Sequence, residues 1–193
     1  MTFPNATTDH SWYDLFAGSL SIERNSLDYK QYPISGRKQF LVAQYVTGTE
    51  KYMPSPITDM GSFDRKVHSW LQMKGEWEQY KTISPYFNLG FMSELVLSSK
   101  NLMNNYTASV LQAPAFTPTP HSQIVFNEAF RANQYVAFGL SPILKFSKLL
   151  HFRLDMYGFA PLYEIKKEEV WNNNTYTAIP YYCLLYTSPS PRD

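Results

Sequence analysis

Cysteine is almost absent from this chain, and the histidines are too scattered to build a metal centre. The 193 residues include one cysteine, Cys183, which lies in a C-terminal segment that is unlike the rest of the sequence. Metal ligands normally recur at short, regular spacings. The four histidines show no such spacing: His10, His68, His121 and His151. The sequence therefore predicts no metal site and no cofactor.

Long apolar runs and an excess of one charge are also absent. No stretch of about 18 apolar residues occurs, which excludes a membrane-spanning helix and leaves a closed barrel as the only way to cross a bilayer. Lysine and arginine number 17 against 16 acidic residues, with no basic run, so nucleic acid is not an expected partner. Residues 1–10 lack the basic start and apolar run of an export signal. Either the chain is cytosolic or its true N-terminus lies outside this sequence.

Aromatic residues are abundant. Fifteen tyrosines, thirteen phenylalanines and four tryptophans make up 17% of the chain. This composition favours strands in general and is also typical of the aromatic girdles of membrane barrels. A soluble β-rich domain is the alternative that composition alone allows.

Two late segments alternate between apolar and polar residues with almost no errors. From Leu150 to Leu162 the even positions are apolar, whereas His151, Arg153 and Asp155 share the other face. The stretch from Tyr135 to Phe146 alternates in the same way. Such alternation predicts strands with one apolar face. Both runs reach the roughly 9 to 11 residues that a tilted strand needs to cross a membrane.

Further strands are predicted along the rest of the chain, and no convincing amphipathic helix. They cover Leu15 to Leu27, Lys38 to Thr47, His68 to Tyr80, Tyr86 to Ser98 and Tyr106 to Leu111, followed by a proline-rich loop from Gln112 to Asn127. Another strand begins near Thr175. The predicted fold is all-β, an incomplete antiparallel transmembrane β-barrel, with about seven strands of a larger barrel of about 16 strands.

The last residues, Cys183 to Asp193, resemble a laboratory sequence. They match, residue for residue, the translation of an adaptor used to prepare sequencing libraries. A genuine Ser/Pro-rich tail is the alternative that their composition allows. We expect residues 183–193 to be a non-native tail and residues 1–182 to be a partial outer-membrane barrel domain, truncated at both ends.

Several segments resemble one family of outer-membrane proteins. The sequence from Leu27 to Gly36 resembles the strand-turn-strand of bacterial surface-antigen barrels, which include outer-membrane assembly factors. The segments Asn104–Ala108, Gln112–Ser122 and Val125–Gln134 are similar to the C-terminal barrel of patatin-like phospholipases of Gram-negative outer membranes. The resemblance covers nearly everything before Tyr182.

The resemblance implies a contact between a loop and the barrel wall. In that family, the loop before a late strand carries a Val-Arg-Gly-Phe type motif that folds into the lumen. The residues from Phe130 to Asn133 are similar, with Ala132 in place of glycine. Arg131 would be the matching arginine, with Asp155 as its partner and Glu94 as a second candidate. The alternative is an exposed loop arginine that contributes little energy.

Other charged residues are expected to line the lumen as a structural network. They are His151, Arg153, Lys145, Glu76 and Glu78. A catalytic network is the alternative, but no nucleophile lies beside them. Acyl hydrolases carry their serine in Gly-x-Ser-x-Gly, whereas Gly139-Leu140-Ser141-Pro142 lacks the second glycine and no Asp-Gly pair occurs. No catalytic residue is therefore predicted within this chain.

Together these observations predict the membrane-anchoring or translocating barrel of a patatin-like phospholipase. The parent would be an acyl hydrolase with a Ser-Asp dyad in a domain absent here, located in the outer membrane of a Gram-negative bacterium. Its partners would be outer-membrane lipids and the assembly machinery. A non-enzymatic surface-antigen barrel in protein insertion or translocation is the second hypothesis, and a soluble β-rich binding domain is the third.

Overall fold

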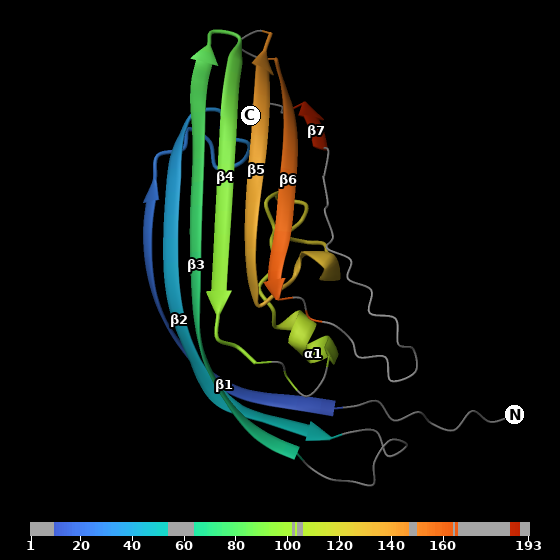
Figure 1. The fold of residues 1–193 in the computed structure, drawn as a ribbon. Helices are drawn as coiled ribbons and strands as arrows, with labels where there is room; N and C mark the ends of the chain where they lie inside the picture. The colour runs from blue at the N-terminus through green and yellow to red at the C-terminus, as the bar shows by residue number, and fades with distance from the viewer. Residues whose placement is uncertain are drawn as a thin grey trace, which may run out of the picture.

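The computed structural model describes residues 10–53, 64–101, 103, 106–146, 150–163, 165 and 186–189. They form one antiparallel sheet in which each strand pairs with its sequence neighbours (Figure 1). The six long strands are β1 His10–Asn25, β2 Gly36–Met53, β3 Asp64–Ser84, β4 Phe87–Ser98, β5 Gln134–Lys145 and β6 His151–Tyr163. The four-residue strand β7, Tyr186–Pro189, pairs with the first half of β6. The all-β prediction is confirmed.

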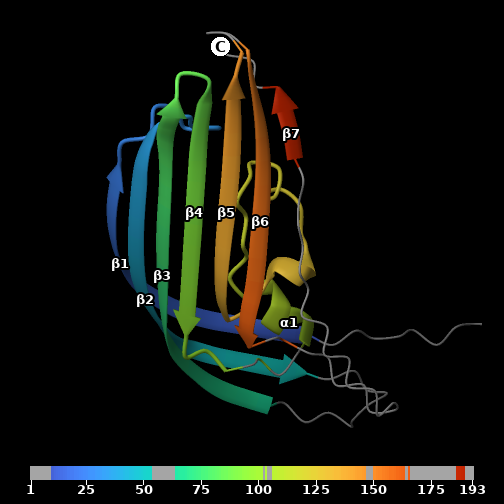
Figure 2. The same cartoon turned by 45° about the horizontal axis from the view of Figure 1, so that its top comes forward.

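The sheet is curved and open. Among the described residues β1 pairs only with β2, and β6 pairs only with β5 and β7, so the described strands do not close a barrel. Figure 2 shows the curved sheet with the segment between β4 and β5 lying on its concave side. No helix in the described part of the chain is long and apolar enough to span a membrane.

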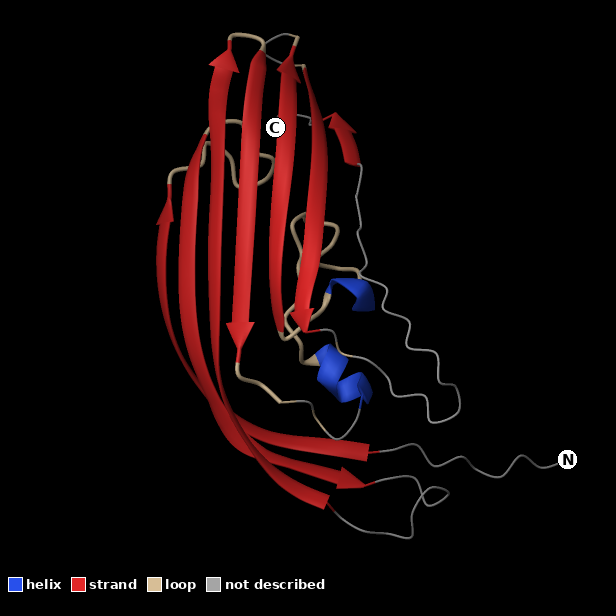
Figure 3. Ribbon diagram, viewed as in Figure 1, coloured by secondary structure: helices blue, strands red, loops and turns tan. Residues whose placement is uncertain are grey.

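Strands β1 to β3 are longer than the sequence predicts, β4 to β6 have nearly the predicted lengths, and one predicted strand is wrong. Their lengths run from 12 to 21 residues. Tyr106–Leu111, expected to be a strand, is the helix α1, and a 3-10 turn follows at Glu128–Phe130 (Figure 3). A short apolar run does not distinguish helix from strand, and here Val110 is buried within α1 rather than paired in the sheet. The strand expected near Thr175 lies outside the described residues, whereas β7 lies within the tail expected to be non-native.

Alternation divides the sheet into two faces. We call the convex side, which carries Phe16, Leu41, Trp77, Leu95 and Phe138, the outer face. We call the concave side, which carries Arg153 and Asp155, the inner face. These outer side chains are exposed, whereas Arg153 and Asp155 are buried. The segment between β4 and β5 packs on Tyr135, Tyr157 and Phe159 of the inner face, and the inward positions of β1 are exposed or half-buried. The parity of β2, ambiguous from the sequence, places Leu41 and Tyr45 outward and Val46 and Glu50 inward.

The two ends of the sheet differ. Strands β1, β3 and β5 end, and β2, β4 and β6 begin, at one end of the sheet, which we call the turn end. Strands β2, β4 and β6 end, and β3 and β5 begin, at the other, which we call the loop end. Strands β1 to β3 bend beneath α1 at the loop end (Figure 1). There Val46, Trp70 and Met103 form a small buried cluster against Tyr13 and Ala108.

Candidate functional site: the polar inner face

Arg153 and Asp155 form the centre of a buried polar network on β6. Arg153 Nε donates to both carboxylate oxygens of Asp155, at 2.7 and 3.0 Å. Ser141 Oγ, on the neighbouring strand β5, donates to Asp155 Oδ1 at 2.5 Å. The arginine is 4% exposed and the aspartate 1%. A buried charge is tolerated where it is paired and hydrogen-bonded in this way.

The same guanidinium extends the network across the sheet. Arg153 Nη2 donates to the Tyr80 hydroxyl of β3 at 2.9 Å, and that hydroxyl donates to Glu78 Oε1 at 2.7 Å. The Tyr80 ring lies over Gly90 of β4, where an added Cβ would approach the ring to 2.3 Å. Because Gly90 has no side chain, the Tyr80 ring can pack over it. The Tyr80 hydroxyl then lies between Arg153 and Glu78 and links them through hydrogen bonds.

The turn between β1 and β2 folds inward and is held by two of these strands. Arg153 Nη1 donates to the Pro33 carbonyl at 2.9 Å, and Asn88 Nδ2 of β4 donates to the Ile34 carbonyl at 2.7 Å. The turn itself is organised by Asp28, whose carboxylate accepts the backbone N–H groups of Tyr29, Ile34 and Ser35. Aspartate side chains commonly stabilise turns in this way. The result is a turn that crosses the inner face from β2 to β6.

Two acidic side chains face each other across β3 and β4, and each has its own lysine. Glu76 and Glu94 are register partners on the inner face. Like charges directly opposite are destabilising, but Lys38 Nζ lies 2.8 Å from Glu76 and Lys74 Nζ lies 2.9 Å from Glu94. The Tyr135 hydroxyl also donates to Glu94. The pairing neutralises both carboxylates.

The contact expected between Arg131 and Asp155 is not formed, and this prediction is corrected. Arg131 Nη1 instead donates to the carbonyls of Leu111 and Ala113, at 2.9 and 3.1 Å. The carbonyls at the end of a helix lack partners within it, so the end of α1 offers acceptors close by. Asp155 is already bound by Arg153 and Ser141, and Glu94 by Lys74 and Tyr135.

The loop nevertheless packs on the inner face of the sheet through apolar contacts. Phe116 and Phe130 pack on Tyr135, Tyr157 and Phe159 of the inner face. The rings of Phe116 and Phe159 stack at 6.0 Å between centroids, and Phe130 meets Phe159 edge-on at 5.7 Å. The phenylalanine before Arg131, rather than the arginine, reaches the sheet.

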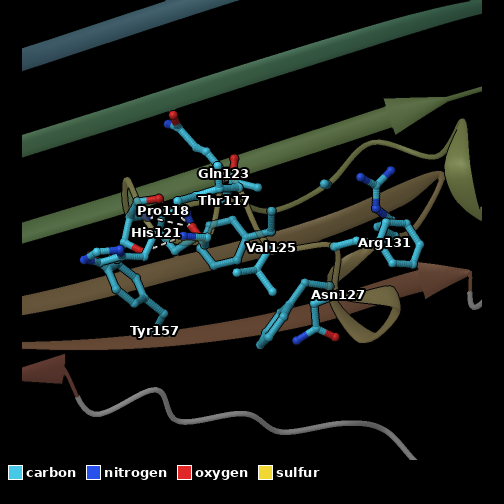
Figure 4. Close-up of a pocket in the computed structure, with 15 residues that line it drawn as sticks. Thr117, Pro118, His121, Gln123, Val125, Asn127, Arg131 and Tyr157 are labelled. Carbon is cyan, nitrogen blue, oxygen red and sulfur yellow. Dashed lines mark hydrogen bonds between the residues drawn. The ribbon is translucent and has the colours of Figure 1, made fainter.

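A pocket of about 440 Å³ lies within this loop and against Tyr157 (Figure 4). Its lining is largely apolar, with His121, Asn127 and Arg131 among the polar side chains. A second, more polar cavity of about 330 Å³ lies between the inner face, the β1–β2 turn and the loop around Pro118. The inner face is therefore covered from both ends of the sheet.

The five residues expected to form a lumen network all lie on the inner face, but they are not one cluster. Arg153 and Glu78 are joined through Tyr80. Glu76 belongs to the separate pair with Lys38. Lys145 is half-buried at the turn end, and His151 is 8% exposed. Their face follows from parity, whereas their partners depend on the register between strands.

The sequence reasoning missed a buried acid–base pair at the loop end. Glu50 Oε2 lies 2.8 Å from His68 Nε2, and the Tyr13 hydroxyl donates to Glu50 Oε1 at 3.2 Å. Glu50 is fully buried. The alternation of β2 and β3 could have placed both residues on the inner face. The predicted second strand, however, ends at Thr47 and does not include Glu50.

The inner face holds no open catalytic or metal site in the described part of the chain. Ser141 and Asp155 are within hydrogen-bonding distance, but they are 4% and 1% exposed and bound into the Arg153 network. No group of three or more His, Cys, Asp or Glu side chains among the described residues could hold a metal ion. The geometry is that of a structural polar network.

The outer face carries ionised side chains only near the strand ends. Between those ends, none of the described outward positions of β1 to β6 carries Asp, Glu, Lys or Arg. The charged positions are Arg24, Arg37 and Lys81 toward the turn end, and Asp14, Lys51 and Arg65 toward the loop end. The outer face is thus apolar between the strand ends, whereas the inner face carries both the ion pairs and the apolar cluster around Phe159.

Comparison with known proteins gives no match. No protein-family model matches the chain, nor does any curated protein or any solved structure.

Proposed function

We propose that this chain forms part of the wall of a transmembrane β-barrel, with its outer face against lipid and its inner face toward a polar lumen. The observation that carries the proposal is the inverted distribution of polarity. Apolar side chains such as Phe16, Leu20 and Phe138 are exposed, whereas the Arg153–Asp155 and His68–Glu50 pairs are buried. Transmembrane barrels have an apolar outer band and a polar interior.

A soluble β-domain fits this distribution poorly. Such a domain buries its apolar faces in a shared core and exposes polar ones. Here the apolar face is the exposed one along six strands, and an exposed apolar area of this extent marks a surface that binds lipid or protein. Strand length supports lipid, since the shortest of the six has 12 residues and a tilted crossing needs about 9 to 11.

The finer proposal is that this barrel anchors or translocates the acyl-hydrolase domain of a patatin-like phospholipase in a Gram-negative outer membrane. It rests on the resemblance of the segments around Asn105, Pro118 and Arg131. Hydrolysis would belong to that other domain, and outer-membrane lipids and the assembly machinery would be the partners.

The proposal is tested by placing an arginine on each face of the sheet. The urea-unfolded chain is diluted into phosphatidylcholine vesicles, and the inserted fraction is measured by flotation and protease protection. Leu95→Arg on the outer face should weaken insertion by about 2–4 kcal/mol, the penalty for arginine near the bilayer midplane. Gln44→Arg, on the polar inner face, is the matched control and should insert like the parent.

If the outer face were exposed to water instead of lipid, Leu95→Arg should have little effect. Substitutions at exposed positions of a soluble protein usually change stability by less than about 0.5 kcal/mol. If Leu95→Arg inserts as well as the parent chain, or if the parent remains soluble and monomeric without lipid, the barrel proposal is wrong.

A further inference from the structure

Two arginines stand next to each other at the turn end of the outer face. Arg24 is opposite Gln39 in the β1–β2 register, and Arg37 is the next outward residue of β2 toward the turn. Both side chains are exposed, and together with Gln79 of β3 they line a hollow of about 320 Å³. Lys81 follows Gln79 as the next outward position of β3. The corner is therefore a concentrated patch of positive charge, which we call the cationic corner (Arg24, Arg37 and Lys81).

The cationic corner has no carboxylate of its own. Asp14 is the one carboxylate among the described outward positions, and it lies toward the opposite end of β1, 3.5 Å from Lys51 Nζ. The nearby Glu76 and Glu78 are on the inner face and are bound to Lys38 and Tyr80. Glu23 precedes Arg24 but lies on the inner face, so among the described residues no acidic side chain balances the corner on its own face.

An apolar groove begins directly beside it. A groove of about 570 Å³ on the outer face is lined by Ile22, Leu41, Trp77 and Leu95, with Arg24 at its end. Gly75 contributes no side chain here, and the nearest atom to a Cβ built on it is Leu41 Cδ1 at 3.9 Å. Arg24 lines both hollows, so the charged corner and the apolar groove are continuous.

We propose that the cationic corner and this groove form a binding site for an anionic phospholipid, with the phosphate at Arg24 and Arg37 and an acyl chain along Trp77 and Leu95. The inference rests on the proposed membrane insertion and names a lipid class for one part of the outer face. The charge at the corner and the apolar groove beside it match the two parts of such a lipid.

The chemistry of the two hollows supports this occupant over others. Guanidinium groups bind phosphate oxygens through paired, charge-assisted hydrogen bonds. Basic residues beside a membrane attract anionic lipids, and this attraction falls with ionic strength. A zwitterionic lipid would fill the groove equally well but would gain less from the positive charge of Arg24 and Arg37.

Trp77 lies in the groove and can report on its occupant. A chain in which Trp12, Trp70 and Trp171 are replaced by Phe is refolded into phosphatidylcholine vesicles that contain a minor fraction of acyl-brominated lipid. Bromine quenches tryptophan only at close contact. We expect the site to prefer phosphatidylglycerol about fivefold. A given quenching of Trp77 should therefore need about five times less brominated phosphatidylglycerol than brominated phosphatidylcholine with the same acyl chains.

Charge removal at each end of the outer face supplies the matched controls. Arg24→Gln with Arg37→Gln should abolish the preference for phosphatidylglycerol, whereas Lys51→Gln with Arg65→Gln at the loop end should leave it intact. Equal quenching by the two lipids, or a preference that survives Arg24→Gln with Arg37→Gln, overturns the lipid site and leaves the barrel proposal standing. Quenching by neither lipid contradicts membrane insertion itself, and the lipid site with it.

Discussion

The outer and inner faces of the sheet are built by the same strands but follow opposite rules. On β6, Phe152 and Leu154 point outward, whereas Arg153 and Asp155, which alternate with them, are buried on the inner face. Phe16 is 75% exposed, whereas Arg153 is 4% exposed. Along β4, β5 and β6, burial therefore follows the side of the sheet that a residue faces rather than its hydrophobicity.

The two faces contribute to the stability of the fold in different ways. Inner-face charges are held by partners at short range, and removing one partner leaves the other buried without compensation. Outer-face side chains have few protein contacts, so their contribution depends on the medium around the sheet. Substitutions on the two faces should consequently behave differently, and the following variants examine that contrast in the chain refolded into detergent micelles.

The largest effect is expected at Arg153. Arg153→Met leaves Asp155 without its cation and frees the Pro33 carbonyl, so the free energy of unfolding should fall by about 3–5 kcal/mol, as measured by urea titration. Arg65→Met on the outer face should change it by less than about 0.5 kcal/mol. Adding Asp155→Asn to Arg153→Met should recover part of the loss, and equal effects at Arg153 and Arg65 would contradict the buried network.

A smaller effect is expected from adding one methyl group to each face. Gly90→Ala on the inner face places a Cβ against the Tyr80 ring, so the ring must move away from Arg153. Overpacking of this kind should lower the free energy of unfolding by about 1–3 kcal/mol. Gly18→Ala on the outer face meets no atom within 4 Å and should be neutral or slightly stabilising. A harmless Gly90→Ala would show that the Tyr80 ring is not fixed there.

The smallest effect concerns Lys100, which follows β4 at the loop end. Burial lowers the pKa of Lys100 to about 8, while its Nζ donates to the Gln112 carbonyl and lies over the Trp70 ring. This folded-state pKa is below the value of about 10.4 in the unfolded chain. At pH values between these two pKa values, the unfolded state therefore binds more protons than the folded state. Stability should therefore rise with pH, by about 1 kcal/mol from pH 7 to pH 9, with most of the rise above pH 8.

The prediction for Lys100 is tested by comparing the pH dependence of unfolding in two chains. The urea midpoint of the parent is compared with that of Lys100→Met at several pH values, so that other titrating groups cancel. The rise should be present in the parent and missing in the variant. Identical pH profiles would show that Lys100 is not buried as a charged group.

The faces of the strands could be predicted from the sequence, and their partners could not. Alternation alone placed Arg153 and Asp155 on one face of β6, because the side-chain period of a strand does not depend on its neighbours. The contact from Arg153 to Pro33 joins residues 120 positions apart. It depends on the register of five strands and on an inward turn, and no local pattern specifies either.

The errors in the prediction have similar causes. The resemblance predicts that Arg131 pairs with Asp155, but its guanidinium donates to carbonyls at the end of α1. The sequence predicts a strand where α1 forms, so it gives no sign of these acceptors. Glu50 and His68 share the inner face of β2 and β3, yet their pairing requires the antiparallel register that brings Gly48 opposite His68. Local alternation predicts faces, whereas ion pairs follow from topology.

Two tryptophans of β3 provide the most direct test of the contrast between the faces. Trp77 points outward and Trp70 is buried on the inner face. Single-tryptophan chains that keep one or the other are refolded into phosphatidylcholine vesicles with brominated acyl chains, and their fluorescence quenching is compared. If the outer face contacts hydrocarbon, Trp77 is strongly quenched and Trp70 is not. Equal quenching of both, or quenching of Trp77 only by a water-soluble agent, would contradict the account.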